Sequence, residues 1–370
     1  MSKRNLATFC NYIFLYYLCA KMILDITRHK FFEGLATLLL FALVTAIATG
    51  VAYTPAEVTS TTTPIGALVS RFAAGHPTLS VIAIIPCVVY AVLRLARATA
   101  RASIYPQSTL GAIALGATTL MALLPSAEYA TLTIVALLTC EAFGRLLYCF
   151  GPNIRAHYLF TAMLALGALP LVDGTFVPLV GAVLLLTIIL RGTLRETIIA
   201  LVGVVTPLTT ACYIEWLSMG NFTAPLLTVW DSLLTSSFTT IIDYLTLPRL
   251  IFLGILVTLT LLSLMQYFTN RVSLGTSARN VWFILMMSVV TIAISIILGH
   301  ISVGIIVAMA IILVPTLPML FICSTPFISV ATYTLFVLAA IAARRRSASG
   351  GEVVISASAF WRPPKMGNLD

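Results

Sequence analysis

Long apolar stretches run through almost the whole of this chain, and they constrain its fold more than any other feature. Hydrophobic residues make up 60% of the 370 residues, charged residues make up 9%, and the mean hydropathy is +1.07. In a soluble domain about a quarter of the residues are charged. The chain therefore predicts an all-α, polytopic membrane protein, because helices satisfy their own backbone hydrogen bonds in lipid.

The apolar runs have the length of membrane-spanning helices, which need about 20 residues each. The length of the chain leaves room for about ten such crossings and for no sizeable soluble domain. Three regions follow: an N-terminal helix over residues 1–30, a transmembrane domain over 31–343 and a disordered cytoplasmic tail over 344–370. We expect spans at residues 36–53, 78–95, 107–124, 129–148, 156–172, 174–190, 197–217, 250–268, 281–299 and 325–343.

Three segments outside these spans are less regular. Residues 1–30 are rich in aromatic side chains between basic ones and lack a small-residue cleavage site, which predicts an interfacial helix, with a first spanning helix as the alternative. In the loop over 54–77, residues 65–72 are suited to the membrane surface. The apolar loop over 218–248 predicts a segment that packs on the membrane face or caps a cavity.

The arginines and lysines fall mostly into loops on one side of the predicted spans. Such a bias places these loops in the cytoplasm. The opposite loops carry the acidic residues and face the periplasm or the exterior. The cytoplasmic set comprises Arg28, Lys30, Arg94, Arg97, Arg101, Arg145, Arg155, Arg191, Arg195, Arg271 and Arg279, and the outer set comprises Arg71, Arg249, Glu57, Glu128, Asp173, Glu215, Asp231 and Asp243.

Residues 302–323 are apolar enough to span, but they contain Pro315 and Pro318. Proline removes a backbone donor and clashes with the preceding helical turn. A full crossing here would also put Arg344, Arg345 and Arg346 outside. We therefore predict a broken, re-entrant pair of short helices and a cytoplasmic C-terminus.

Two groups of charged residues are candidates for chemistry at the cytoplasmic end. Glu141 and Arg145 are spaced to pair on one helix face, as a relay or as an internal ion pair. Arg191 and Arg195 flank the start of the seventh span, where Thr193 and Glu196 fit a capping box. The two arginines are candidates for binding the phosphate of a lipid headgroup.

On the outer side, Asp173, Glu215, Asp231 and Asp243 are candidates for an acidic mouth, with solvated loop charges as the simpler interpretation. The histidines and cysteines have no metal-ligand spacing, and no nucleotide-binding or hydrolase motif is present. We expect no metal, no cofactor and no nucleic-acid partner.

Residues 77–220 resemble an uncharacterised family of multi-pass inner-membrane proteins of Gram-negative bacteria. The likeness rests on Leu190-Arg191, Arg195-Glu196, the run Ala200-Leu201-Val202-Gly203, Thr206-Pro207, Tyr213 and Gly220 in this order, and on the hairpin region over 166–170. The resemblance implies a polytopic protein of the bacterial inner membrane, and it implies no activity and no catalytic residues.

Three functions remain open on the sequence, and whether the protein is an enzyme stays undecided. The first is the handling of a lipid or lipid-linked glycan, which the arginines at a helix start favour and the acidic outer face disfavours. The second is secondary transport of a small solute, and the third is a non-catalytic membrane subunit or scaffold. The expected partners are membrane lipids, a lipid-linked substrate and a membrane protein.

Overall fold

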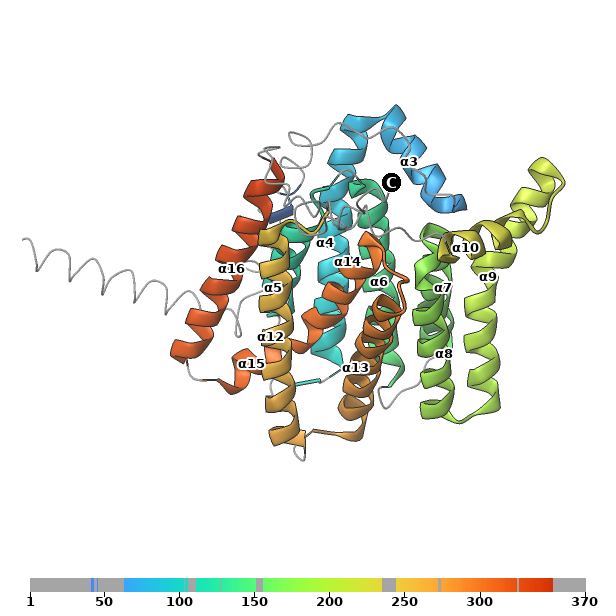
Figure 1. The fold of residues 1–370 in the computed structure, drawn as a ribbon. Coiled ribbons are helices and arrows are strands. Elements are labelled where there is room, and N and C mark those ends of the chain that lie inside the picture. Colours follow the sequence, from blue (N-terminus) through green and yellow to red (C-terminus); the bar gives the residue numbers. More distant parts are fainter. Residues whose placement is uncertain are drawn as a thin grey trace, which may run out of the picture.

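The computed structural model describes residues 41, 42, 45, 63–102, 104–105, 111–126, 128–150, 156–234, 244–271, 274–324 and 326–348. Within these ranges every regular element is a helix, so the predicted all-α class is confirmed there (Figure 1). The elements are α3 (Pro64–Gly75), α4 (Pro77–Arg101), α5 (Ala112–Leu123), α6 (Tyr129–Cys149), α7 (Ala156–Val172), η1 (Gly174–Phe176), α8 (Val177–Arg191), α9 (Leu194–Met219), α10 (Ala224–Leu234), α12 (Leu247–Asn270), α13 (Thr276–Ile297), α14 (Val303–Leu313), η3 (Val314–Thr316), α15 (Pro318–Cys323) and α16 (Pro326–Ala348).

Eight segments of the described chain are long and apolar enough to cross a membrane. They are α4, α6, η1 with α8, α9, α12, α13, the run from α14 to α15, and most of α16. This confirms a multi-pass membrane protein by helix length and hydropathy. Helix α5, with 12 residues, is too short to cross alone, and α7 has 17. The predicted N-terminal helix and the predicted span over 36–53 lie outside the described residues, apart from residues 41, 42 and 45.

The long helices form a bundle with chemically different ends. The α8–α9 and α12–α13 turns lie at the lower end in Figure 1, which we call the basic end and which carries Arg101, Arg191, Arg195, Arg271 and Arg279. The opposite end carries Glu128, Asp173 and Asp231 and is called the acidic end. Helix α3 lies across the acidic end, in keeping with the surface location expected for residues 65–72.

The segment with two prolines is broken as predicted, but it does not form a re-entrant hairpin. Helix α14 starts at the acidic end, where His300 Nδ1 lies 3.1 Å from the Leu233 carbonyl oxygen. Helix α15 finishes near the basic end, where Asn270 Nδ2 lies 3.6 Å from Cys323 Sγ. Because the chain advances through the break instead of turning back, the re-entrant prediction is wrong (Figure 1).

The direction of the last helix follows from this path. Helix α16 returns from α15 toward the acidic end, so Arg344 lies at the end opposite Arg191 (Figure 1). Under the charge-based orientation, the C-terminal helix ends on the outer side, which differs from the predicted cytoplasmic C-terminus. Helix α16 also continues to Ala348, past the start predicted for the disordered tail, and the rest of that tail lies outside the described residues.

Hydrogen bonds from neighbouring segments satisfy the backbone at the break. The Tyr105 hydroxyl donates to the Pro315 carbonyl, and the Ser263 hydroxyl donates to the Thr316 carbonyl. Both acceptors are carbonyls that a continuous helix would have bonded internally. The broken helix is therefore held by protein side chains, and Pro318 lies buried beside it.

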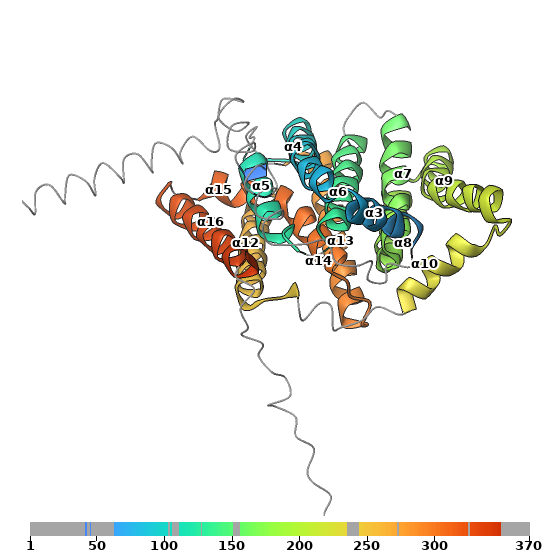
Figure 2. The same cartoon turned by 90° about the horizontal axis from the view of Figure 1, so that it is seen from above.

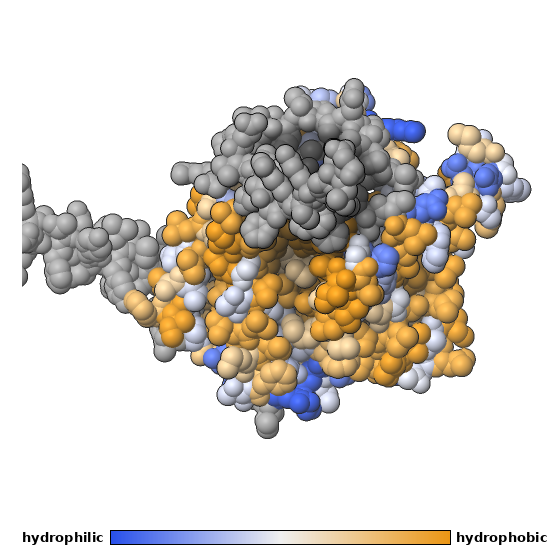
Figure 3. Space-filling view, viewed as in Figure 1, coloured by the Kyte–Doolittle hydropathy of each residue, from blue (hydrophilic) through white to orange (hydrophobic). Residues whose placement is uncertain are grey.

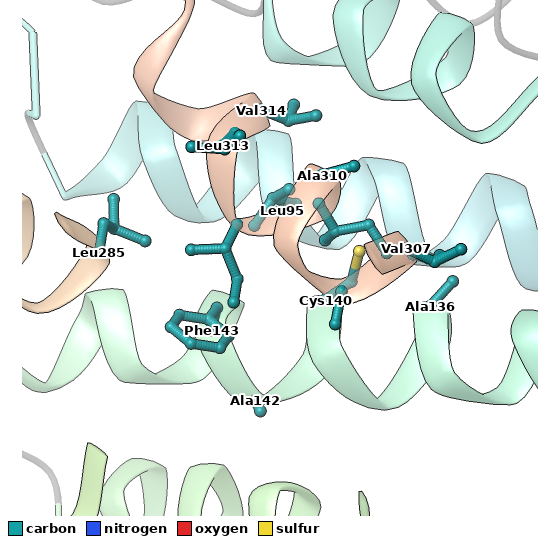
Figure 4. Packing of buried hydrophobic residues seen from close by; sticks show 14 of the residues in the cluster. Leu95, Ala136, Cys140, Ala142, Phe143, Leu285, Val307, Ala310, Leu313 and Val314 are labelled. Atoms are coloured by element: carbon teal, nitrogen blue, oxygen red, sulfur yellow. The ribbon is translucent and has the colours of Figure 1, made fainter. Parts of the chain in front are cut away.

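The core is built around α14, which is buried along its whole length. It packs against α5, α6, α12 and α13, and Figure 4 shows its side chains among those of α4, α6 and α13. Leu95, Cys140, Phe143 and Leu285 are each at most 2% exposed in this cluster. A helix with no polar face is expected at the centre of such a bundle.

A second packing layer runs through α4, α6, α7 and α9, which lie side by side when the bundle is viewed from above (Figure 2). Helices α7 and α9 approach closely because glycines lie at their contact. A Cβ at Gly203 would lie 2.8 Å from Met163 Cβ and 2.8 Å from the Phe160 carbonyl oxygen. A Cβ at Gly167 would overlap the carbonyl of Val204.

Apolar side chains cover the outside of the bundle between its two ends (Figure 3). Helix α9 exposes Leu201, Val202 and Ile214, while Tyr213 and Trp216 are exposed near its acidic end. This pattern fits contact with lipid chains along the bundle and an aromatic belt at the interface.

Candidate functional site

The turn between α8 and α9 is fixed by its own sequence. Gly192 adopts φ 68° and caps α8 by donating its N–H to the Ile188 carbonyl. Thr193 is the N-cap of α9, and its hydroxyl oxygen accepts from the Glu196 N–H at 3.4 Å. The same hydroxyl donates to Glu196 Oε2 at 2.8 Å. The predicted N-cap at Thr193, with Glu196 three residues on, is therefore confirmed.

Arg191, the last residue of α8, is held inside the protein at this turn. Its side chain is only 8% exposed, and its guanidinium carbon lies 4.9 Å from the centre of the Phe150 ring. Its Nη1 is 3.7 Å from Glu196 Oε1, which is longer than a hydrogen bond. Its Nε and Nη2 are buried and make no hydrogen bond with any residue that the structure describes. A buried guanidinium with two unused donors is costly unless an anion completes it.

Arg195 differs from Arg191 in its surroundings. It lies in the first turn of α9 with its side chain exposed, and it makes no ion pair with any described residue. The helix break at Gly192 separates the two arginines, so the structure does not bring them together as one clamp. Arg195 instead adds positive charge at the mouth of the turn.

Glu141 pairs with Arg145, as the i, i+4 spacing predicts, and the pair proves to be part of a larger cluster. Arg94 Nε donates to Glu141 Oε2 at 3.0 Å, and the Tyr90 hydroxyl donates to the same oxygen at 3.1 Å. Arg145 Nη2 pairs with Oε1. Arg94 and Tyr90 belong to α4, so this cluster ties α4 to α6.

Sequence reasoning missed Arg94 as a partner of Glu141, because the two lie far apart in the chain. The signal in the sequence was the position of each residue along its predicted span. Arg94 lies in the last third of α4, and Glu141 lies in the last half of α6. A carboxylate inside a membrane span is expected to pair with cations, including cations on neighbouring helices. Arg94 also lies 5.4 Å from the ring centre of Tyr148, which stacks on Tyr158.

The last turn of α6 connects the Glu141 cluster to Arg191. Cys149 Sγ lies 3.4 Å from the Arg145 carbonyl oxygen. The next residue, Phe150, supplies the ring beneath Arg191. Three arginines (94, 145 and 191) against two glutamates (141 and 196) give a net charge of +1 before Arg195 is added. The arrangement therefore suits an anion.

At the acidic end, Asp173 has a structural role in the chain turn before α8. Its Oδ1 accepts from the Thr175 N–H at 3.0 Å and from the Thr175 hydroxyl at 2.8 Å. The Thr175 hydroxyl also contacts Ser302 at 2.9 Å. Burial, and secondarily the charge of Asp173, raises the pKa of Glu128.

The other predicted acidic residues do not join this turn as a defined mouth. Glu215 lies on α9 and Asp231 is exposed on α10, while Asp243 lies outside the described residues. In the part of the chain that the structure describes, no group of three histidines, cysteines or acidic residues is placed to hold a metal ion.

Arg249 is a further buried arginine that the sequence did not single out. It is 3% exposed, and its Nη1 donates to the Tyr244 carbonyl at 2.9 Å while its Nη2 donates to the Pro125 carbonyl. The Tyr244 hydroxyl donates to the Leu123 carbonyl at 2.7 Å. These bonds cap the end of α5 and fasten α12 to it, which is a structural role.

Of the sites described, the Arg191 turn alone combines a deeply buried charge, two unused donors in the same group and an exposed second cation. Comparison of the chain with protein-family models, with curated proteins and with solved structures finds no match in any of the three.

Proposed function

We propose that this membrane protein binds the phosphate of a lipid or lipid-linked substrate at its basic end. Arg191 carries the proposal, because within the described part of the chain its buried guanidinium has Nε and Nη2 free of any hydrogen bond. These two atoms form one side of the guanidinium fork, which matches two oxygens of a phosphate.

The surroundings of Arg191 favour a ligand with an apolar chain. Ile189, Leu194 and Ile198 are 65%, 80% and 54% exposed beside the α8–α9 turn. In a membrane these side chains contact lipid, so a bound phosphate would have apolar surface next to it. The basic end faces the cytoplasm in this proposal, following the excess of arginine there. The family resemblance over residues 77–220 adds the bacterial inner membrane as the proposed location.

Native mass spectrometry of the gently purified protein tests the proposal, with identification of whatever stays bound. We expect an anionic lipid or lipid-linked adduct that is lost when Arg191 and Arg195 are both changed to glutamine. Arg271→Gln is the matched control, since Arg271 is also an exposed arginine at the basic end. Equal adduct in the double variant and in wild type would refute the proposal.

The same spectra address the other functions considered. A stoichiometric protein partner with only bulk lipid would favour a non-catalytic subunit. Transport of a small solute has one supporting observation, the carboxylate of Glu141 within the bundle. That carboxylate already has two arginines and a tyrosine as partners, which favours a structural ion cluster over a mobile relay.

A further inference from the structure

We infer that the Arg191 site selects a terminal phosphate on an apolar chain, that is, a phosphomonoester or diphosphate lipid, over the phosphodiester of common membrane lipids. This inference rests on the proposed function and adds the class of ligand. It depends on the net positive charge around Arg191, which the carboxylate of Glu196 lowers but does not cancel.

Glu196 is close to Arg191 but does not satisfy it. Its Oε2 accepts from the Thr193 hydroxyl at 2.8 Å, and its N–H donates to the same hydroxyl oxygen. These two bonds hold the carboxylate in the capping box, with Oε1 at 3.7 Å from Arg191 Nη1. The carboxylate therefore faces Nη1, while the Nε and Nη2 side of the guanidinium remains unpaired.

The charge of Glu196 lowers the positive potential that a ligand meets at Arg191. Any anion that reaches Arg191 is repelled by this fixed carboxylate, so attraction has to come from the remaining cations, including Arg195. A phosphomonoester carries a charge of about −1.5 to −2 at pH 7, whereas a phosphodiester carries about −1. Where the electrostatic potential is positive overall, the ligand with the larger negative charge gains more binding free energy from the same site.

The number of free oxygens points the same way. A phosphodiester has two unesterified oxygens, and the Nε and Nη2 donors of Arg191 would use both. A terminal phosphate has a third, which remains for water. The exposed Leu194 and Ile198 favour a source with an acyl or polyprenyl chain over free phosphate.

The experiment compares two anionic lipids, one with a terminal phosphate and one with a phosphodiester. The full-length protein is placed in phosphatidylcholine nanodiscs that contain either phosphatidic acid, a phosphomonoester, or phosphatidylglycerol, a phosphodiester. Retained lipid is counted by native mass spectrometry. Wild type should retain phosphatidic acid several-fold better, and this preference should fall between pH 8 and pH 5, because the second phosphate pKa is about 6.

Two variants separate the inference from the proposed function. Arg191→Gln should lower phosphatidic acid binding about tenfold, as expected for a lost charge-assisted contact. Glu196→Gln preserves the capping box, since glutamine also serves there. It should raise the binding of both lipids and raise the ratio of phosphatidic acid to phosphatidylglycerol, because removing a negative charge favours the ligand with more charge. Arg271→Gln is again the control and should behave as wild type.

The contrary outcomes are distinct. Equal retention of both lipids by wild type, with loss of both in Arg191→Gln, would overturn the selectivity and leave the proposed function intact. An unchanged ratio in Glu196→Gln would also overturn the role of Glu196. No effect of Arg191→Gln on either lipid would overturn the proposed function itself. Displacement of phosphatidic acid by millimolar inorganic phosphate would identify free phosphate as the ligand and overturn the lipid source.

Discussion

An arginine within an apolar bundle needs partners for its guanidinium, and this protein supplies them in three ways. Arg249 donates to backbone carbonyls at the end of α5. Arg94 and Arg145 share the carboxylate of Glu141. Arg191 has the face of Phe150 and a distant carboxylate, so its donors are the least satisfied. This difference in satisfaction separates a binding candidate from structural arginines.

Residue spacing predicted part of this pattern and missed the rest. The Glu141–Arg145 pair and the Thr193–Glu196 cap are local, so helix periodicity alone reveals them. Arg94 comes from another helix, and its contact with Glu141 depends on how α4 packs on α6. The burial of Arg191 likewise depends on Phe150, which belongs to a different helix end.

At the acidic end, the partly buried position of Glu128 predicts a pH-dependent stability. Burial raises the pKa of Glu128, and Asp173 adds to the rise. The folded state then prefers the protonated carboxyl, so its stabilising effect is present at low pH and is lost as the pH rises through the raised pKa. We expect Glu128→Gln to unfold at a higher temperature than wild type at neutral pH, with the difference shrinking on acidification.

Thermal unfolding in detergent at several pH values measures this effect. Asp173→Asn serves as a second variant, because asparagine retains the oxygen that accepts from Thr175 while the charge is removed. In an Asp173→Asn background, Glu128→Gln should raise the unfolding temperature at neutral pH by less than it does in wild type. A gain that is the same at pH 4 and pH 8 would contradict the linkage.

Among the helices, the break at Pro315 shows that the sequence of a segment predicts where its helix breaks, but not the path of the chain after the break. Two prolines three residues apart predict a break because each one lacks a backbone donor. The path after the break depends on Tyr105 and Ser263, whose hydroxyls donate to the carbonyls of Pro315 and Thr316 within it. These partners lie on distant segments, so the sequence of the element alone did not distinguish a crossing from a hairpin.

The contact between α7 and α9 provides a test at the same scale. A side chain at Gly167 would overlap the Val204 carbonyl, whereas Gly181 on α8 has open space around its Cβ position. We expect Gly167→Ala to lower stability by about 1–3 kcal/mol, the usual range for overpacking a close contact. Gly181→Ala should have no such cost. Equal unfolding temperatures for the two variants would show that α7 and α9 are not in close contact.

For the whole molecule, composition and hydropathy predicted the class of fold and most of the spans. The predicted spans from 129–148 to 281–299 each overlap a helix of the structure. The main error concerns the number of crossings after residue 300, and it reverses the side on which the last helix ends. Helix counting is sensitive to one ambiguous segment, because each crossing changes the side of everything that follows.

Cysteine labelling of intact cells tests this arrangement. In a background without the natural cysteines, we expect cysteines at Gly75 and Arg344 to react from one side of the membrane and a cysteine at Arg195 to react from the other. Gly75 ends α3 at the acidic end and provides the reference. Labelling of Arg195 and Arg344 from the same side would restore a re-entrant segment between α13 and α16.

The central position of α14 has a consequence for how the protein is made. This helix belongs to the most apolar of the described membrane spans, yet ten of its eleven residues are buried in the finished bundle. It leaves the ribosome after α4 to α13, so those helices enter the membrane before the segment that fills the space between them exists. Assembly of the core therefore waits for the last quarter of the chain, and products that stop after α13 would hold lipid in its place.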